Sequence, residues 1–170
     1  MKAAQAAFFF APTPDHDRDI DKDMMINTDI AATLRKASTI AVVGLSAKSH
    51  RPSYEVAGYL QQHGYRILPV NPMEQGASIL GEACHASLDH AVQAAQRQGI
   101  QIDIVDCFRR SEEIPPIVDD MIRLGLGCIW MQQGVINTGA ADKALAAGIR
   151  VVMDRCMKVD HAIFNIPRKE

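Results

Sequence analysis

The sequence has little of several features that would assign a protein to a functional class at once. Aromatic residues make up only 5% of its 170 residues, and the net charge is -2 with a pI near 6.3. Proteins that bind nucleic acids normally carry a clustered basic surface, so we expect no nucleic-acid partner. No apolar run is long enough to cross a membrane, and the apolar segment around residues 8–10 is brief for a secretory signal.

Cysteine is also scarce, and its spacing fits neither a metal site nor a disulfide framework. The four cysteines form no Cys-x-x-Cys pair and have no histidine at the spacing of a zinc ligand. Three of them lie in or beside apolar runs, where a free thiol is an ordinary small core residue. We therefore expect no metal and a reducing, cytoplasmic location.

The length of the chain predicts one domain behind a short N-terminal extension. A composition that is 48% hydrophobic is sufficient for one well-buried domain of this size. We expect residues 1–24 to be a disordered extension and residues 25–170 to be the single domain. The alternative is that the aromatic residues at 8–10 dock on the domain as a small apolar patch.

Apolar runs alternate with segments of helical spacing along this domain. The runs at 39–45, 66–72, 101–108, 127–132 and 149–154 are typical of strands buried on both faces, and a short strand is predicted at 83–88. Helices are predicted at 27–37, with Asn27 or Thr28 as the cap, and at 54–64, 88–99, 115–125 and 137–148. This alternation predicts an α/β fold, a Rossmann-like, doubly wound and mainly parallel sheet of five or six strands with helices on both faces.

The loop after the first strand carries the clearest chemical signal. Sheets of this kind bind ligands beyond the carboxyl ends of their strands. Gly44 allows a tight turn there, Ser46 and Ser53 supply hydroxyl groups, and Lys48 and Arg51 supply positive charge. The helix predicted to begin near Ser53 adds free N–H groups and its dipole. The loop therefore predicts a pyrophosphate site, although it lacks the Gly-x-Gly-x-x-Gly pattern, and a helix cap in a solvated loop is the alternative.

The end of the second strand indicates which nucleotide to expect. NAD sites normally place Asp or Glu there to accept hydrogen bonds from ribose hydroxyls. This chain has the neutral Asn71, which would not repel a ribose that carries an extra phosphate. Together with Lys48 and Arg51, Asn71 favours NADP or coenzyme A over NAD. The alternative is an ordinary turn at Asn71 and Pro72.

Four ordered motifs resemble a known family. They are VVGLSAKSHRPSYEVAGYLQQHGYRILPVNP, DIVDCFRRSEEIP, IWMQQGVIN and VVMDRCMKVDH. Through them, residues 31–161 resemble the stand-alone coenzyme A-binding proteins, which are related to the CoA-binding domain of the succinyl-CoA synthetase α subunit. The resemblance implies a Rossmann-like CoA-binding fold with the ligand lying across the strand ends.

The resemblance also implies three groups of contact residues. They are a phosphate loop of Gly44, Ser46, Lys48, Arg51, Ser53 and Tyr54, an adenosine side of Val70, Asn71 and Pro72, and a cleft rim of Phe108, Arg109, Trp130 and Gln132. Spacing alone favours a core position for Trp130. Asp160 stands where the family often has Glu.

We expect the protein to bind coenzyme A or a short acyl-CoA without chemistry of its own. We do not expect the ligase activity of the synthetases in this protein, because they need a phosphorylatable His in a second domain, for which this chain is too short. Cys156 lies between Arg155 and Lys158 but has no adjacent histidine, so no complete catalytic set is visible. The alternatives are an NADP-linked reductase, a CoA-dependent transferase, and a protein that docks on another CoA enzyme. A homo-oligomer is left open.

Overall fold

A five-stranded parallel sheet forms the centre of the computed structural model, which describes residues 22–170. The strands lie in the order β2-β1-β5-β6-β7, and every neighbouring pair is parallel. They are β1 (Thr39–Val43), β2 (Arg66–Val70), β5 (Ile104–Cys107), β6 (Cys128–Met131) and β7 (Arg150–Val152). The predicted α/β, Rossmann-like class is confirmed.

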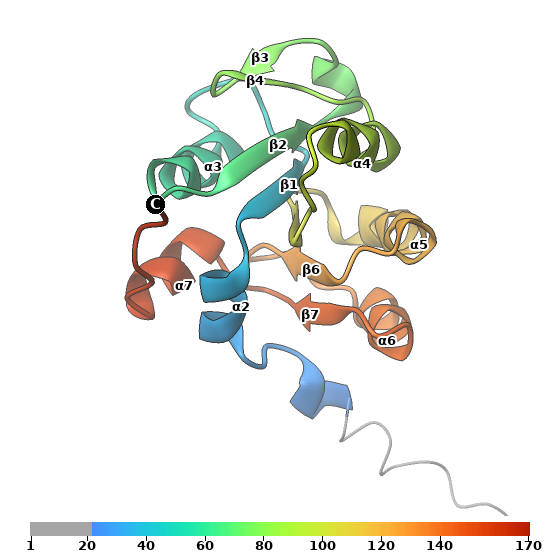
Figure 1. Ribbon diagram of the computed structural model, residues 1–170. Coiled ribbons are helices and arrows are strands. Elements are labelled where there is room, and N and C mark those ends of the chain that lie inside the picture. Colours follow the sequence, from blue (N-terminus) through green and yellow to red (C-terminus); the bar gives the residue numbers. More distant parts are fainter. Residues whose placement is uncertain (1–21) are drawn as a thin grey trace, which may run out of the picture.

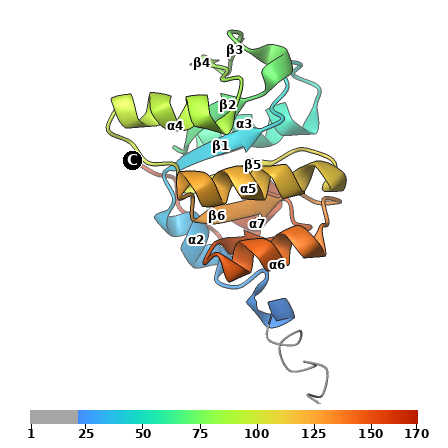
Figure 2. The ribbon, with the colours of Figure 1, turned by 90° about the vertical axis from the view of Figure 1, so that its right-hand side faces the viewer.

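Helices cover both faces of the sheet, which explains why its strands are apolar along nearly their whole length (Figure 1). One face carries α2 (Ile30–Lys36), α3 (Pro52–Gln62) and α7 (Met157–Ile163). The other face carries α4 (Leu88–Arg97), α5 (Ile114–Leu124) and α6 (Thr138–Ala146), which lie side by side in Figure 2. Each face has its own cluster of buried apolar side chains.

The order in which the chain adds strands to the sheet reverses between β1 and β5, although all five strands are parallel. From β1 the chain first adds β2 on one side and later adds β5 on the other. The register pairs Val43 with Cys107 and Cys107 with Met131. The residues that follow these three, Gly44, Phe108 and Gln132, therefore lie in a row at the carboxyl ends, where ligands of such sheets bind.

The connections at the edges of the sheet differ most from the sequence prediction. In place of a strand at 83–88, β3 (Ser78–Ile79) and β4 (Glu82–Ala83) form an antiparallel pair, and His85 makes one isolated bridge to Val70. Helix α7 was not predicted. Short 3-10 turns, η1 (Pro72–Glu74) and η2 (Ser111–Glu113), follow β2 and β5.

The predicted cap of the first helix was wrong. Helix α2 begins at Ile30, after Asp29, and the side chain of Asn27 instead bonds to both the N–H and the carbonyl of Met153. A side-chain amide can donate and accept at once, so Asn27 binds the segment after β7, at the edge of the sheet, and does not cap the helix.

The predicted extension at residues 1–24 lies outside the described residues except for its last three, which are helical. Among residues 22–170, no helix has the length and apolar character needed to span a membrane.

Candidate functional site

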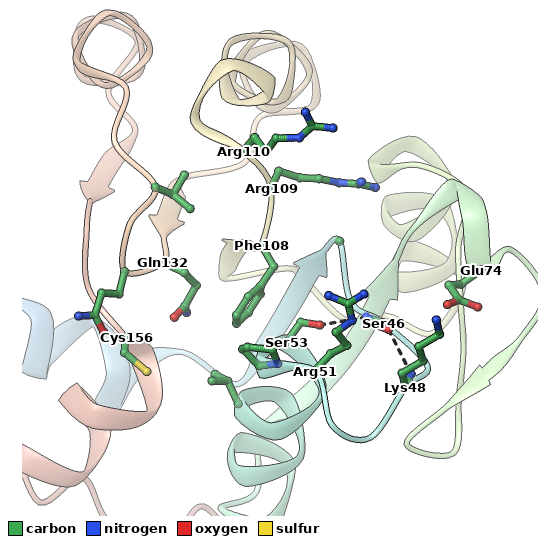
Figure 3. A pocket seen from close by; sticks show the side chains of 15 residues that line it. Ser46, Lys48, Arg51, Ser53, Glu74, Phe108, Arg109, Arg110, Gln132 and Cys156 are labelled. Carbon is green, nitrogen blue, oxygen red and sulfur yellow. Dashed lines mark hydrogen bonds between the residues drawn. The ribbon is translucent and has the colours of Figure 1, made fainter.

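A cleft of about 710 Å³ lies over the carboxyl ends of β1, β5 and β6, beside the first turn of α3 (Figure 3). This volume is within the usual range for small-molecule sites. The cleft is lined by Gly44, Ser46, Lys48, Arg51, Pro52, Ser53, Val56, Glu74, Phe108, Arg109, Arg110, Gln132, Gln133, Val135 and Cys156. It thus brings together most of the phosphate-loop and rim residues expected from the sequence.

Gly44 is required by a close approach of two backbones. Its φ is +86°, and a Cβ atom at this position would lie 2.4 Å from the carbonyl oxygen of Phe108. No other residue fits there without displacing the end of β5. The glycine therefore lets the loop after β1 start in contact with the backbone of Phe108, where the loop after β5 also starts.

The two serines hold the loop after β1 in its turn. Ser53 Oγ accepts a hydrogen bond of 3.1 Å from the N–H of Ser46, and Ser46 Oγ accepts one of 3.1 Å from the N–H of Lys48. The Ser53 side chain therefore does not cap its own helix, which begins after Arg51 without a side-chain cap. The loop is folded onto the start of α3 by these bonds.

The first turn of α3 has unpaired donors beside the cleft. Pro52 has no N–H, and the N–H groups of Ser53 and Tyr54 have no hydrogen-bond partner within residues 22–170. Free N–H groups at the start of a helix, together with the positive end of its dipole, favour a bound anion. This geometry matches the expectation from the sequence.

Three cations add positive charge at the same end of the cleft. Within the described part of the chain, Lys48, Arg51 and Arg109 have no carboxylate at ion-pair distance. Arg110 is different, because its exposed side chain pairs with Glu112 and Glu113. The first three cations are therefore available to a ligand, and Arg110 is partly neutralised.

Asn71 acts on the cleft from behind its wall. Its amide nitrogen donates to the carbonyl of Leu45 at 3.1 Å, and its amide oxygen accepts from the N–H of Met73 at 3.0 Å. The same oxygen lies 3.5 Å from a terminal nitrogen of Arg109. Asn71 is buried and absent from the lining, so it holds the loop after β1 and steadies Arg109 from outside the cleft.

Four other residues expected at the site also lie off the cleft surface. Trp130 is fully buried, and its ring nitrogen donates to the carbonyl of Arg155 at 2.8 Å. It is a core residue, as spacing alone favoured, and not part of the rim. The remaining three, Tyr54, Val70 and Pro72, are not among the lining residues.

Phe108, Gln132 and Cys156 lie toward the end of the cleft away from Lys48 and Arg51 (Figure 3). The lining also includes the apolar Val56 and Val135 and the polar Gln133. Val135, Val56 and Glu74 were not expected from the sequence. Glu74 belongs to η1 after β2, and its carboxylate lies 3.5 Å from the N–H of Ala47, a position that no local motif signals.

The titratable groups at the cleft do not form a metal site. Within residues 22–170 there is no cluster of three or more His, Cys, Asp or Glu side chains arranged to hold a metal ion. Behind Gln132, the fully buried Asp106 accepts a hydrogen bond of 2.7 Å from the Gln132 amide nitrogen. Desolvation raises the pKa of Asp106 to about 7.

Comparisons with known proteins agree with this geometry. Residues 38–162 match the family model of the CoA binding domain. The chain is 36% identical over 135 residues to YneT of Bacillus subtilis, an uncharacterised protein, and the match covers 79% of this chain and 93% of that protein.

Two solved structures are similar to this chain in sequence and fold. A Thermus thermophilus protein is 35% identical with a TM-score of 0.68, and the match covers 78% of this chain and 94% of that chain. A hypothetical protein from Pyrococcus horikoshii is 28% identical with a TM-score of 0.70, and the match covers 97% and 99% of the two chains. With a family model that matches most of its length, this chain belongs to the CoA binding domain family.

Proposed function

We propose that this protein binds coenzyme A or a short acyl-CoA in the cleft over β1, β5 and β6, without chemistry of its own. The observation that carries the proposal is the division of one cleft into a cationic end and an apolar end. Lys48 and Arg51 mark the first end in Figure 3, and Phe108 and Cys156 lie toward the second. Coenzyme A has the same division between its phosphates and its pantetheine arm.

The cationic end fits a pyrophosphate and a ribose phosphate. The free N–H group of Ser53, at the start of α3, suits the pyrophosphate. Lys48, Arg51 and Arg109 supply positive charge, and within residues 22–170 none of them has a carboxylate at ion-pair distance. The residues present therefore fit the ligand that the family implies. Their task is to bind and orient the phosphates.

The apolar end fits an arm that is mostly hydrocarbon and amide. Phe108, Val56 and Val135 offer apolar contact, and the Gln132 amide is available for one hydrogen bond. The lining includes one thiol, Cys156, and no histidine, so no base stands beside a nucleophile there. We therefore propose binding and not catalysis.

One residue favours a second ligand class. The carboxylate of Glu74 lines the cleft after β2, near the place where dinucleotide-binding proteins hold a ribose through its hydroxyl groups. This position would suit NAD, because a carboxylate accepts hydrogen bonds from an unphosphorylated ribose. The same carboxylate would repel the ribose phosphate of coenzyme A unless Lys48 and Arg51 outweigh it.

Titration calorimetry with coenzyme A, dephospho-CoA and NAD separates the two classes. We expect coenzyme A to bind most tightly and NAD most weakly. Arg51→Ala should weaken coenzyme A by about 1–3 kcal/mol, the scale of a charge-assisted hydrogen bond. The matched control Arg97→Ala, which removes an exposed charge from α4, should leave the affinity unchanged.

Glu74→Gln should change the affinities for coenzyme A and NAD in opposite directions. It should tighten coenzyme A, because a repelling charge is removed, and it should weaken NAD if the ribose hydroxyls are bound there. Tighter binding of NAD than of coenzyme A by the parent protein, with a further loss of NAD affinity in Glu74→Gln, would overturn the proposal.

We also propose that the protein works in a reducing compartment such as the cytoplasm. All four cysteines are free, and Cys84, Cys107 and Cys128 are buried where an oxidant reaches them poorly.

A further inference from the structure

A carboxylate without a cation lies in the middle of the fold. Asp106 is on β5, the central strand, and none of its surface is exposed. The other buried acid among residues 22–170, Asp160, is paired with Arg155 through two hydrogen bonds of 2.6 and 2.7 Å. Asp106 has no such partner within the described part of the chain, and its Oδ2 has no hydrogen-bond partner at all there. A buried polar group of this kind costs stability, so its presence calls for a reason.

The one side-chain hydrogen bond that Asp106 makes within residues 22–170 connects it to the wall of the cleft. Asp106 Oδ1 accepts from the Gln132 amide nitrogen at 2.7 Å, a length typical of bonds to charged groups. The two residues meet because Asp106 pairs in register with Trp130, and Gln132 comes two residues after Trp130 on the same side of β6. Gln132 is itself only 4% exposed, yet it is part of the cleft wall.

This contact fixes which end of the Gln132 amide faces a ligand. An ionised carboxylate only accepts hydrogen bonds, so it holds the amide nitrogen on the core side. The amide oxygen is then left on the cleft side, and Figure 3 shows it directed toward the space between Phe108 and Cys156. Without Asp106 the amide could turn over and offer a donor instead.

We propose that Asp106, when ionised, is a positioning residue that holds the Gln132 oxygen as a hydrogen-bond acceptor in the cleft beside Phe108 and Cys156. This acceptor selects ligands whose arm carries an N–H or S–H donor beyond the phosphates. The inference rests on the proposed function, since coenzyme A has amide N–H groups and a thiol along that arm. Beyond that function, the Gln132 oxygen is the group that would accept a hydrogen bond from the arm, and Asp106 is the residue that orients the Gln132 amide.

The raised pKa of Asp106 supplies a readout that a purely structural role would not have. Ionised Asp106 accepts from the Gln132 nitrogen, whereas protonated Asp106 can donate to the Gln132 oxygen and turn the amide over. Asp106 interacts electrostatically with the thiols of Cys107 and Cys128. Burial raises the pKa of Cys128 to about 12 and that of Cys107 well above its usual range, so both thiols stay neutral near pH 7.

Calorimetry with two probes tests the proposal. Coenzyme A carries the arm, and adenosine 3′,5′-bisphosphate lacks it. We expect Asp106→Leu and Gln132→Met each to weaken coenzyme A about tenfold, the scale of one lost hydrogen bond to a charged or oriented group, and to leave the bisphosphate within about twofold. The double variant should be no worse than either single variant, because the two residues act as one unit. Equal losses for both probes would show a structural effect and overturn the proposal, as would no loss in either variant.

Asp106→Asn provides a second test that does not depend on folding without the polar group. It keeps an acceptor for Gln132 but cannot ionise. In the parent protein the affinity for coenzyme A should rise through pH 7 more steeply than in Asp106→Asn, while titration of the ligand phosphates affects both proteins alike. Identical pH profiles would overturn the proposal.

Further comparisons identify the donor and separate this inference from the proposed function. If Asp106→Leu and Gln132→Met weaken the binding of coenzyme A but not of acetyl-CoA, which has no S–H, the ligand's donor is its thiol. If the two variants weaken the binding of both ligands equally, the donor is an amide N–H. If the parent protein binds coenzyme A no better than the bisphosphate, this inference fails while the phosphate site stands. If it binds neither probe, the proposed function fails with it.

Discussion

The ring nitrogen of Trp130 donates a hydrogen bond of 2.8 Å to the carbonyl oxygen of Arg155, and this bond ties the core of the sheet to the segment that carries Cys156. The Arg155 side chain is held in turn by the buried Asp160 on α7. The wall of the cleft near Cys156 is therefore anchored from below by β6 and from one side by α7. Trp130 acts on the cleft through this anchor and not by touching a ligand.

Trp130→Phe should destabilise the protein and loosen this wall together. The change leaves a small cavity and an unpaired carbonyl, which should cost about 2–4 kcal/mol in the free energy of unfolding. Coenzyme A should bind more weakly. Urea denaturation and calorimetry measure the two effects.

Tyr65→Phe is the matched control for that variant. The Tyr65 hydroxyl also donates to a buried carbonyl, that of Leu34, but on the side of the core away from the cleft. It should cost about 1–2 kcal/mol and leave the affinity for coenzyme A unchanged. Equal effects of the two variants on binding would refute the anchoring role of Trp130.

Gly44→Ala should abolish ligand binding and strongly destabilise the fold. The added Cβ would meet the Phe108 carbonyl at 2.4 Å, in addition to the strain of a φ of +86°. Gly148→Ala separates the two costs, because Gly148 has a φ of +78° and no atom within 4 Å of an added Cβ. We expect Gly148→Ala to cost about 1–2 kcal/mol by denaturation, and Gly44→Ala clearly more. Similar melting curves for the two variants would contradict the close approach of Gly44 to the Phe108 carbonyl.

Asp106 should make the stability of the free protein depend on pH. Its pKa is raised from 3.8 to about 7 in the folded state, so the folded protein binds more protons than the unfolded chain between these values. The free energy of unfolding should therefore fall as pH rises from about 4 to about 7 and change little above it from this group. His161 works in the opposite direction, because burial lowers its pKa and stability is lost as pH falls.

The comparison with Asp106→Asn isolates this contribution. The variant keeps the histidines but lacks the ionisable group, so the difference in unfolding free energy between parent and variant should shrink or reverse from pH 5 to pH 8. A constant difference across this range, measured by urea denaturation, would contradict the burial of an unpaired carboxylate.

Cys156 should be the most reactive of the four thiols, and a ligand should protect it. It is partly exposed and lines the cleft, whereas Cys84, Cys107 and Cys128 are buried and burial raises the pKa of each. Alkylation followed by peptide mass mapping should label Cys156 first. Saturating coenzyme A should slow this labelling, and unchanged labelling would place the ligand elsewhere.

The regular part of the fold could be predicted because periodicity and burial agree there. The five strands of the sheet are apolar runs buried on both faces, so their positions follow from composition, and their alternation with helices fixes the parallel arrangement. The β3 and β4 pair has only two residues in each strand. Helix α7 has seven residues, of which the polar Asp160 and His161 are buried while Val159 and Ile163 are exposed, so neither segment gives a clear periodic signal.

The candidate site was predicted where the residues are adjacent in sequence and less well where contacts are distant. The loop from Gly44 to Ser53 lines the cleft as expected, because a turn after a parallel strand must face that edge. The resemblance placed Asn71 and Trp130 at the ligand, but both are buried and neither lines the cleft. For Trp130 spacing alone favoured the core, whereas the partners of the Asn71 amide cannot be seen in the sequence. The pair of Asp106 and Gln132 depends on the register of β5 against β6, and the only signal in the sequence is a carboxylate inside the apolar run IVDC.

Native mass spectrometry of the protein incubated with an equimolar mixture of coenzyme A, NADP and NAD tests ligand identity most directly, because the mass of the complex names the ligand without a choice of assay. We predict one dominant complex with the added mass of coenzyme A, and its loss in Arg51→Ala but not in Arg97→Ala. A dominant NADP or NAD complex, or free protein alone at saturating ligand, would contradict the assignment of the cleft to coenzyme A.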